Sequence, residues 1–259
     1  MKLYCLESGI LCTYKHLFTL AVDVGLEFTV PVPYLLIEHP RGKVLFDTGN
    51  AREILDNKKE HWGNVLAAYD PVMLPEQWCV SALRGLGVRP EDIDWVILSH
   101  LHPDRTGGIG RFPKARYLIQ QDEIHYAYAP DSFMRNVYIM KDFDKPVNWY
   151  FLRGWEDDVF DLFGDGSLVI YFTPGHTPGH QSLLVNLPKT GKLFFAADSC
   201  YTDENLERRI PPGLAWNFGD CERTMQRIRH LRDAQGVRVI AGRDMHSWRQ
   251  FKQAPYFYE

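Results

Sequence analysis

The sequence predicts an α/β fold in four layers, an αββα sandwich. Strand-sized apolar runs alternate with amphipathic stretches along the 259 residues, and strands outnumber helices. The strands fall into two groups, one in each half of the chain, and several are joined by tight turns. Two sheets packed face to face, with helices over their outer faces, account for this pattern. We expect a single domain over residues 1–259.

The first half of the chain predicts a hairpin, a helix and a buried strand. Runs 33–38 and 43–47 flank the sequence His-Pro-Arg-Gly at 39–42, whose turn chemistry favours a hairpin. A helix is predicted over 75–86, because a proline stands at its start and glycines stand at its end. Residues 92–99 are predicted to form a buried strand, because they contain the apolar stretch Trp-Val-Ile-Leu at 95–98.

The second half repeats this alternation of strands and helices. Glycine-containing turns at 164–166 and 188–191 each separate two strand-like runs. In chain order, the predicted elements are a strand at 115–120, a helix from about 122, strand pairs at 158–163 with 167–172 and at 180–187 with 192–197, a helix at 220–234 and a strand at 237–241.

Composition and charge exclude several classes of protein. Apolar residues make up 45% and charged residues 24%, so intrinsic disorder is not expected. The net charge is −4 without any Lys/Arg run, which argues against nucleic acid as a partner. Apolar runs such as 193–197 are no longer than a strand, and Glu7 interrupts the region where a signal peptide needs apolar residues, so we expect no membrane association. Five cysteines without a CxxC pair indicate reduced thiols in a cytoplasmic protein.

The strongest chemical signal is the sequence Ser-His-Leu-His-Pro-Asp at 99–104, directly after a predicted strand. His100 and His102, two residues apart in an irregular turn, can bind one divalent metal, and zinc favours such imidazole ligands. Alone, this pair is a weak signal, because surface histidines also pair by chance.

Other acidic and imidazole residues stand at the ends of other predicted strands. His176 and His180 follow one strand, Asp198 follows a second and Asp47 ends a third. With the strand that precedes His100, this makes four strand ends, and residues at these ends can converge on one rim of a sheet sandwich. Together with the histidine pair, they predict a metal centre at that rim.

These motifs resemble the metallo-β-lactamase superfamily and, within it, the N-acyl-homoserine lactonase branch, the quorum-quenching lactonases. The tyrosine three residues after the last aspartate, Tyr201 here, is a feature of that branch. The segments that carry the resemblance are Lys2–Tyr4, Pro33–Ile37, Asp47–Gly49, Ser99–His102, Thr173–Ser182 and Ala197–Tyr201.

The resemblance implies an αββα sandwich with a dinuclear metal centre at one edge. By analogy, His100, His102 and His176 bind the first metal, Asp198 bridges both metals and Asp104 serves the second. It also implies a small lactone as substrate, most typically an N-acyl-homoserine lactone, and a homodimer.

The resemblance further implies a hydrolytic mechanism. A metal-held hydroxide attacks the lactone carbonyl, because bound zinc lowers the pKa of water to about 7. Tyr201 donates a hydrogen bond to the carbonyl oxygen, and an aspartate, assigned here to Asp104, delivers the proton to the leaving alkoxide. Asp47 holds a ligand histidine in the right tautomer, and His180 is expected to pack beside the ligands.

The chain departs from the family pattern at two positions. The family motif His-x-His-x-Asp-His ends here in Arg105, and the family's later Gly-His-Asp is Gly-Arg-Asp with Arg243. A guanidinium stays protonated and offers no lone pair, so neither arginine can bind a metal. The sequence therefore predicts one firmly bound zinc ion and an impaired second site.

The two arginines match the charge of what they replace. Our hypothesis is that Arg105 and Arg243 pair with Asp104 and Asp198, take the structural place of the second metal, and hold a substrate carbonyl or carboxylate. They are therefore catalytic candidates. The alternative is that they only stabilise a site that has lost its activity.

Residues 123–156 are rich in aromatic side chains without a clear period. One interpretation is ordinary packing, and the other is a lid that lines an apolar pocket. In the lactonase hypothesis an acyl chain lies against this segment and an apolar N-terminal loop. The aromatic residues are Tyr126, Tyr128, Phe133, Tyr138, Phe143, Trp149, Tyr150, Phe151 and Trp155, and the loop residues are Leu17, Phe18, Leu26 and Phe28.

The preferred interpretation is a metallo-hydrolase of lactones that operates with one zinc ion. Two alternatives remain open. One is a non-catalytic ligand-binding protein on the same fold. The other is a mononuclear iron enzyme, in which His100 or His102, His176 and Asp198 form a two-His-one-carboxylate face.

Overall fold

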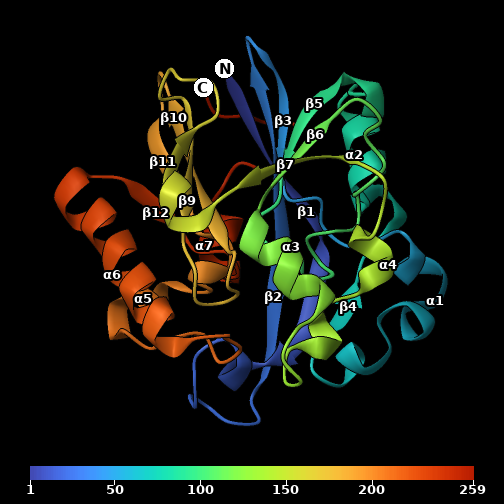
Figure 1. Cartoon of the computed structure of the whole chain (residues 1–259), viewed down its shortest axis with the longest axis vertical. Helices are drawn as coiled ribbons and strands as arrows, with labels where there is room; N and C mark the ends of the chain where they lie inside the picture. Colours follow the sequence, from blue (N-terminus) through green and yellow to red (C-terminus); the bar gives the residue numbers. More distant parts are fainter.

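The computed structural model describes all 259 residues, and its strands form two sheets (Figure 1). The larger sheet consists, in spatial order, of β4 (Asp70–Val72), β1 (Lys2–Tyr14), β2 (Glu27–His39), β3 (Gly42–Phe46), β5 (Ile93–Ile97), β6 (Arg116–Gln120) and β7 (Asn148–Leu152). Pairing is antiparallel from β4 to β3 and parallel from β3 to β7. The smaller sheet consists of β12 (Arg238–Ile240), β11 (Gly191–Phe195), β10 (Gln181–Leu187), β9 (Leu168–Phe172) and β8 (Val159–Asp161).

Helices cover the outer face of each sheet. In the larger sheet, α2 (Cys79–Gly85) and α3 (Gln121–Tyr128) share a core of 22 buried residues with β2, β5 and β6. On the smaller sheet, α6 (Phe218–Gln235) packs on the outer face of β10 and β11 (Figure 1). The short helices are α1 (Glu53–Trp62), α4 (Met140–Phe143), α5 (Asp203–Arg208), α7 (Met245–Arg249) and the 3-10 helices Lys15–Leu17, Gly63–Ala67, Pro75–Gln77, Pro90–Asp92, Arg135–Val137, Gly154–Asp157 and Ala197–Ser199.

The two sheets face each other across a core of 20 buried residues, to which Leu35 and Ile97 contribute from the larger sheet. Successive residues of β10 alternate in direction, so that Leu183 and Val185 face this core while Leu184 faces α6. Because both faces of the sheet are covered, β10 needs apolar residues on both sides and forms a nearly continuous apolar run. The predicted αββα sandwich and its three hairpins are confirmed.

The helix predicted over 75–86 is in fact two helices. The backbone at Trp78 is extended (φ −61°, ψ 134°), which separates a 3-10 turn over Pro75–Gln77 from α2. The Gln77 side chain accepts a hydrogen bond of 2.9 Å from the Leu74 amide and closes the first turn. The proline therefore marks the start of a short turn, not of one continuous helix.

The long strand β1 was not predicted, because polar residues interrupt its alternation. Its register with β2 shifts between Glu7 and Ile10, which marks an irregularity there. Gly9 lies inside it at φ +75°, and a Cβ at this position would lie 2.2 Å from the carbonyl oxygen of Val72. Only glycine fits this close approach.

The aromatic-rich segment 123–156 contains regular elements: most of α3, all of α4 and the edge strand β7. Tyr138 and Phe143 are buried, whereas Phe133 and Trp155 are exposed. A lid function for this segment stays a prediction. None of the helices combines the length and apolar character that a membrane crossing requires.

Candidate metal centre

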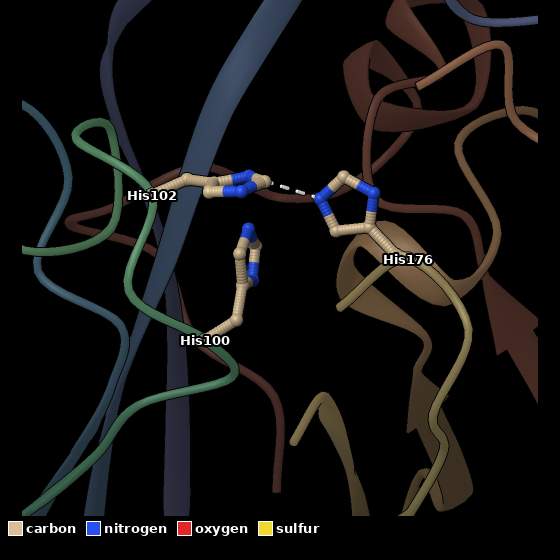
Figure 2. Close-up of side chains that lie close together, drawn as sticks. All are labelled: His100, His102 and His176. Atoms are coloured by element: carbon tan, nitrogen blue, oxygen red, sulfur yellow. Dashed lines mark hydrogen bonds between the residues drawn. The ribbon is translucent and has the colours of Figure 1, made fainter. Parts of the chain in front are cut away.

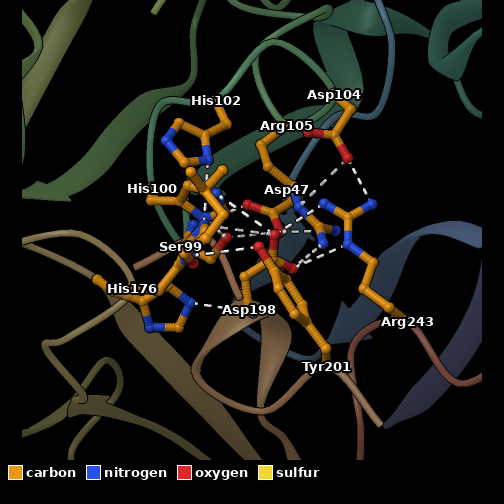
Figure 3. Close-up of polar contacts among 12 residues, drawn as sticks. Asp47, Ser99, His100, His102, Asp104, Arg105, His176, Asp198, Tyr201 and Arg243 are labelled. Carbon is orange, nitrogen blue, oxygen red and sulfur yellow. Dashed lines mark hydrogen bonds and ion pairs between the residues drawn. The ribbon is translucent and has the colours of Figure 1, made fainter. Parts of the chain in front are cut away.

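Loops from both sheets carry the candidate residues to one place (Figure 3). Each loop follows the carboxyl end of a strand: β3 and β5 in the larger sheet, and β9, β11 and β12 in the smaller sheet. In that order, the loops supply Asp47, residues 100–105, His176, Asp198 and Arg243. The structure thus brings together the strand-end residues that the sequence singles out.

Three buried histidines face one another at the centre of the site (Figure 2). One ring nitrogen from each of His100, His102 and His176 lies within 4.8 Å of the others. His176 Nε2 is 3.0 Å from His102 Nδ1, close to the roughly 3.3 Å between two nitrogen ligands of one tetrahedral zinc ion. His100 Nε2 is buried without a hydrogen-bond partner, and it and His176 Nε2 each lie 3.6 Å from Asp198 Oδ2. These donors fit one metal ion.

The electrostatic environment keeps these imidazoles neutral. Burial, and then the neighbouring imidazoles, lower the pKa of His100 and of His102 well below the usual range. Burial also lowers the pKa of His176, which Asp198 and the Leu214 carbonyl partly oppose. A neutral imidazole keeps the lone pair that a metal needs.

A relay of hydrogen bonds sets the tautomer of His100. The Asp47 carboxylate accepts from the Ser99 amide (2.7 Å) and from the Ser99 hydroxyl (2.8 Å). Because that hydroxyl donates to Asp47, it accepts from Nδ1 of His100 at 3.0 Å, which leaves His100 Nε2 free of a proton. Asp47 thus acts on His100 through Ser99, a residue that the sequence analysis did not single out.

His176 and His180 are oriented by their own loops. The Leu214 carbonyl accepts a hydrogen bond from His176 Nδ1 at 3.0 Å, so Nε2 faces the cluster with a lone pair. His180 Nδ1 contacts the hydroxyl and carbonyl of Thr173, and its Nε2 accepts from the Asp198 amide at 3.1 Å. Burial lowers the pKa of His180 to about 3, so it stays neutral in this role.

Two buried arginines occupy the other side of Asp198. Arg243 donates from Nε (3.1 Å) and Nη2 (2.8 Å) to the two carboxylate oxygens of Asp198, and its Nη1 lies 2.5 Å from Asp104 Oδ2. Arg105 also contacts Asp198 through Nη2, and donates from Nη1 to the carbonyl of Pro33 at 3.0 Å. Side chains of both arginines are 4% exposed or less.

These ion pairs fix the charge of Asp198. Burial alone would raise the pKa of Asp198, but Arg105 and Arg243, followed by His176, hold it well below its usual range. Asp47, by contrast, has a pKa raised to about 6 by burial, against the opposing effects of Arg105 and Ser99.

A small cavity of about 30 Å³ opens beside the histidines. Tyr201 lines it, with its hydroxyl 3.3 Å from His176 Nδ1 and its ring 4.6 Å from the ring of Phe18. Burial raises the pKa of Tyr201 well above its usual value, so the hydroxyl stays protonated and can donate a hydrogen bond. The polar lining consists of His102, Asp104, Asp198, Tyr201 and Arg243, and the remaining lining of Leu11, Phe18, Trp62, Val65, Tyr69, Pro103, Val137 and Leu214.

Glu123 of α3 ties the histidine loops together, which the sequence analysis missed. Its fully buried carboxylate accepts from the amide of Leu101 (3.0 Å), the amide of Gly179 (3.2 Å) and the hydroxyl of Tyr138 (3.0 Å). Leu101 lies between the first two histidines, and Gly179 lies in the loop of the third. A glutamate at the start of a helix carries no signal that would distinguish this role from an ordinary exposed residue.

Comparisons with known proteins agree with this geometry. The chain matches the family model of the metallo-beta-lactamase superfamily over residues 29–243. It is 42% identical to the N-acyl homoserine lactonase AttM of Azorhizobium caulinodans over 260 residues, which cover 100% of this chain and 99% of that protein.

Two solved structures share the fold. One is an N-acyl homoserine lactone hydrolase with the product N-hexanoyl-L-homoserine bound at the catalytic metal centre (TM-score 0.89, 24% identity, 99% of this chain and 98% of that chain). The other is AidC, a dizinc quorum-quenching lactonase in complex with a product (TM-score 0.72, 17% identity, 98% of this chain and 92% of that chain).

Proposed function

Because this chain belongs to the metallo-beta-lactamase superfamily and, within it, to the N-acyl homoserine lactonase family, we propose that it is a metal-dependent hydrolase that opens the ring of a lactone. The substrate is an N-acyl-homoserine lactone or a similar small lactone. The observation that carries the proposal is the cluster of three neutral, buried imidazoles beside a cavity lined by Tyr201.

We assign one zinc ion to His100, His102 and His176, with Asp198 beside it. When bound, zinc lowers the pKa of a coordinated water to about 7 and so supplies a nucleophile at neutral pH. Three imidazole ligands leave a fourth position open, which is the arrangement of catalytic zinc sites.

The residues of the chain then act on the lactone. Tyr201 Oη donates a hydrogen bond to the carbonyl oxygen as negative charge develops there. Asp104 lines the same cavity, where its carboxylate takes up a proton from the attacking water and passes it to the leaving alkoxide oxygen. Arg243 holds Asp104 in place through Nη1 and lines the same cavity, where its guanidinium can donate a hydrogen bond to the substrate carbonyl.

A second metal ion does not fit this chain. The oxygens of Asp104 and Asp198 that would bind it already contact guanidinium groups, and Arg105 and Arg243 offer no lone pair. We therefore propose that the two arginines take the place of the second metal found in dizinc relatives.

The charges of the site agree with one metal. Three buried carboxylates, Asp47, Asp104 and Asp198, face two buried guanidiniums, Arg105 and Arg243, which leaves a net charge of −1. One Zn²⁺ and one hydroxide bring this sum to zero, whereas a second Zn²⁺ would leave two uncompensated positive charges in a buried site.

Metal-dependent ring opening tests the proposal. Protein dialysed against a chelator should not hydrolyse an N-acyl-homoserine lactone, one equivalent of Zn²⁺ should restore hydrolysis, and a second equivalent should add nothing. Acid release in a weakly buffered indicator solution measures the rate. Reconstitution with Fe²⁺ in parallel compares the iron alternative directly.

A ligand-binding protein is the second candidate, because Arg105 and Arg243 already neutralise Asp198. Calorimetric binding of the lactone without any turnover, in protein that carries its zinc, would favour this candidate and contradict the hydrolase.

A further inference from the structure

Two residues that line the cavity carry buried hydrogen-bond donors without a partner in the protein. They are the indole Nε1 of Trp62 and the hydroxyl of Tyr69, and both residues line the cavity beside Asp104, Asp198 and Arg243. Burial raises the pKa of Tyr69 well above its usual value, so its hydroxyl remains a donor. A buried hydrogen-bond donor without an acceptor costs free energy of folding. When its residue lines a ligand cavity, this suggests that the ligand supplies the acceptor.

The same two residues also pack among apolar side chains. Trp62 and Tyr69 belong to a cluster of ten buried residues that also contains Leu11, Val65 and Phe18. An indole N–H can only donate, so a group that pairs with it must present an acceptor oxygen. Phenylalanine in place of either residue would fill the cavity wall without an unpaired polar group, so packing alone does not account for the two polar atoms.

Their place in the chain separates them from the hydrolytic residues. Trp62 ends α1, and Tyr69 follows the 3-10 helix Gly63–Ala67. The groups assigned above to the metal and the ring carbonyl come from loops after β5, β9, β11 and β12. The two donors therefore approach the cavity from a different segment of the chain.

We infer that Trp62 Nε1 and Tyr69 Oη bind a carbonyl oxygen on the substituent of the lactone ring, so that the chain selects lactones that carry an amide there over lactones with a plain alkyl substituent. The inference rests on the proposed function and adds to it the two residues that determine specificity. The ring carbonyl remains with Tyr201 and Arg243, and the donors act on binding rather than on bond cleavage.

A comparison of two substrates tests this inference. An N-acyl-homoserine lactone and a γ-lactone with an alkyl chain of the same length differ in the amide. In Tyr69→Phe and Trp62→Phe, the ratio of kcat/KM for the amide-bearing lactone to kcat/KM for the alkyl lactone should fall about tenfold to hundredfold, mainly through KM for the amide-bearing lactone. Calorimetry with the ring-opened N-acyl-homoserine and zinc-loaded protein should show an equal loss of affinity.

Matched controls come from other buried aromatic residues with unpaired polar atoms. Tyr34 and Trp78 also lack partners for Oη and Nε1, and neither lines this cavity. Tyr34→Phe and Trp78→Phe should leave the ratio of the two substrates unchanged.

Three results would overturn the inference. Tyr69→Phe and Trp62→Phe could slow both lactones equally, which would indicate a structural role or an action on the ring carbonyl. They could slow neither, which would mean that the donors do not contact the substrate. Wild-type protein that opens neither lactone would contradict the proposed function and, with it, this inference.

Discussion

The residues on the two sides of Asp198 differ in how they can balance its buried negative charge. On one side, His100, His102 and His176 are neutral, and Nε2 of His100 and of His102 has no protein partner. On the other side, Arg105 and Arg243 bind every nearby carboxylate. The first side leaves nitrogen lone pairs open for an ion, whereas the carboxylates on the second side are already paired with guanidinium groups. A loop scaffold with one bridging carboxylate can therefore support a metal site and a permanent ion-pair network next to each other.

Removal of one imidazole should have the largest effect. In His176→Ala the metal loses a ligand, so zinc content should fall towards zero and lactone hydrolysis should decrease by several orders of magnitude. Elemental analysis and initial rates measure both. His125→Ala on the exposed side of α3 is the control and should retain metal and activity. Full activity of His176→Ala would remove the triad from the mechanism.

Loss of the Arg243 guanidinium should instead lower the stability of the folded protein. Arg243→Met keeps much of the side-chain volume but leaves Asp104 and Asp198 without their shared partner, so the free energy of unfolding of metal-free protein should fall by about 3–5 kcal/mol. Arg223, exposed and paired with Asp220, is the control, and Arg223→Ala should cost about 1 kcal/mol or less. Urea unfolding distinguishes the two. Equal losses of unfolding free energy in the two variants would mean that the buried ion pairs add nothing to stability.

Glu123 connects the loops on the metal side. In Glu123→Gln, one of the groups that now donates to the carboxylate would face an amide N–H₂, which should cost about 1–3 kcal/mol of stability. Because the histidine loops lose a shared anchor, zinc affinity should fall about tenfold or more. Competition with a chromogenic chelator measures that affinity. Exposed Glu91→Gln should change neither quantity, and unchanged zinc affinity in Glu123→Gln would show that Glu123 serves stability alone.

Asp47 contacts both sides, through Ser99 and through Arg105. Its pKa is about 6 in the folded protein and near 3.8 in the unfolded chain, so between these values the folded state binds more protons. The contribution of Asp47 to the free energy of unfolding should therefore be greatest below pH 4. It should be lost as the pH rises to 6, by at most about 1.4 kcal/mol per pH unit. Asp47→Asn removes the titration.

The measurement for Asp47 is the difference in unfolding free energy between wild type and Asp47→Asn at pH 4.5 and pH 7. The difference should move in favour of the variant at the higher pH. A difference that is independent of pH would contradict the raised pKa.

The sequence patterns predicted the layers of the fold and the main residues of the site, because both follow from local signals. Each strand end that carries His or Asp can be recognised in the sequence by itself, and the sandwich fold brings these strand ends together. Ser99 and Glu123 were not found, because each acts through contacts between loops that are far apart in the chain. Trp62 and Tyr69 carry no local signal either, since an unpaired donor is defined by what surrounds it. The strand β1 was not predicted, because Gly9 and its neighbours interrupt the alternation of apolar and polar residues.

The number of zinc ions per chain tests the central claim most directly. Elemental analysis of protein purified without chelators or a metal-affinity tag should give one zinc in wild type, two in the Arg105→His/Arg243→His double variant, and one in the exposed control Arg249→His. Anomalous scattering at the zinc edge should locate the wild-type ion between His100, His102 and His176. Two zinc ions in wild type would contradict the role of the arginines, and none would contradict the metal centre itself.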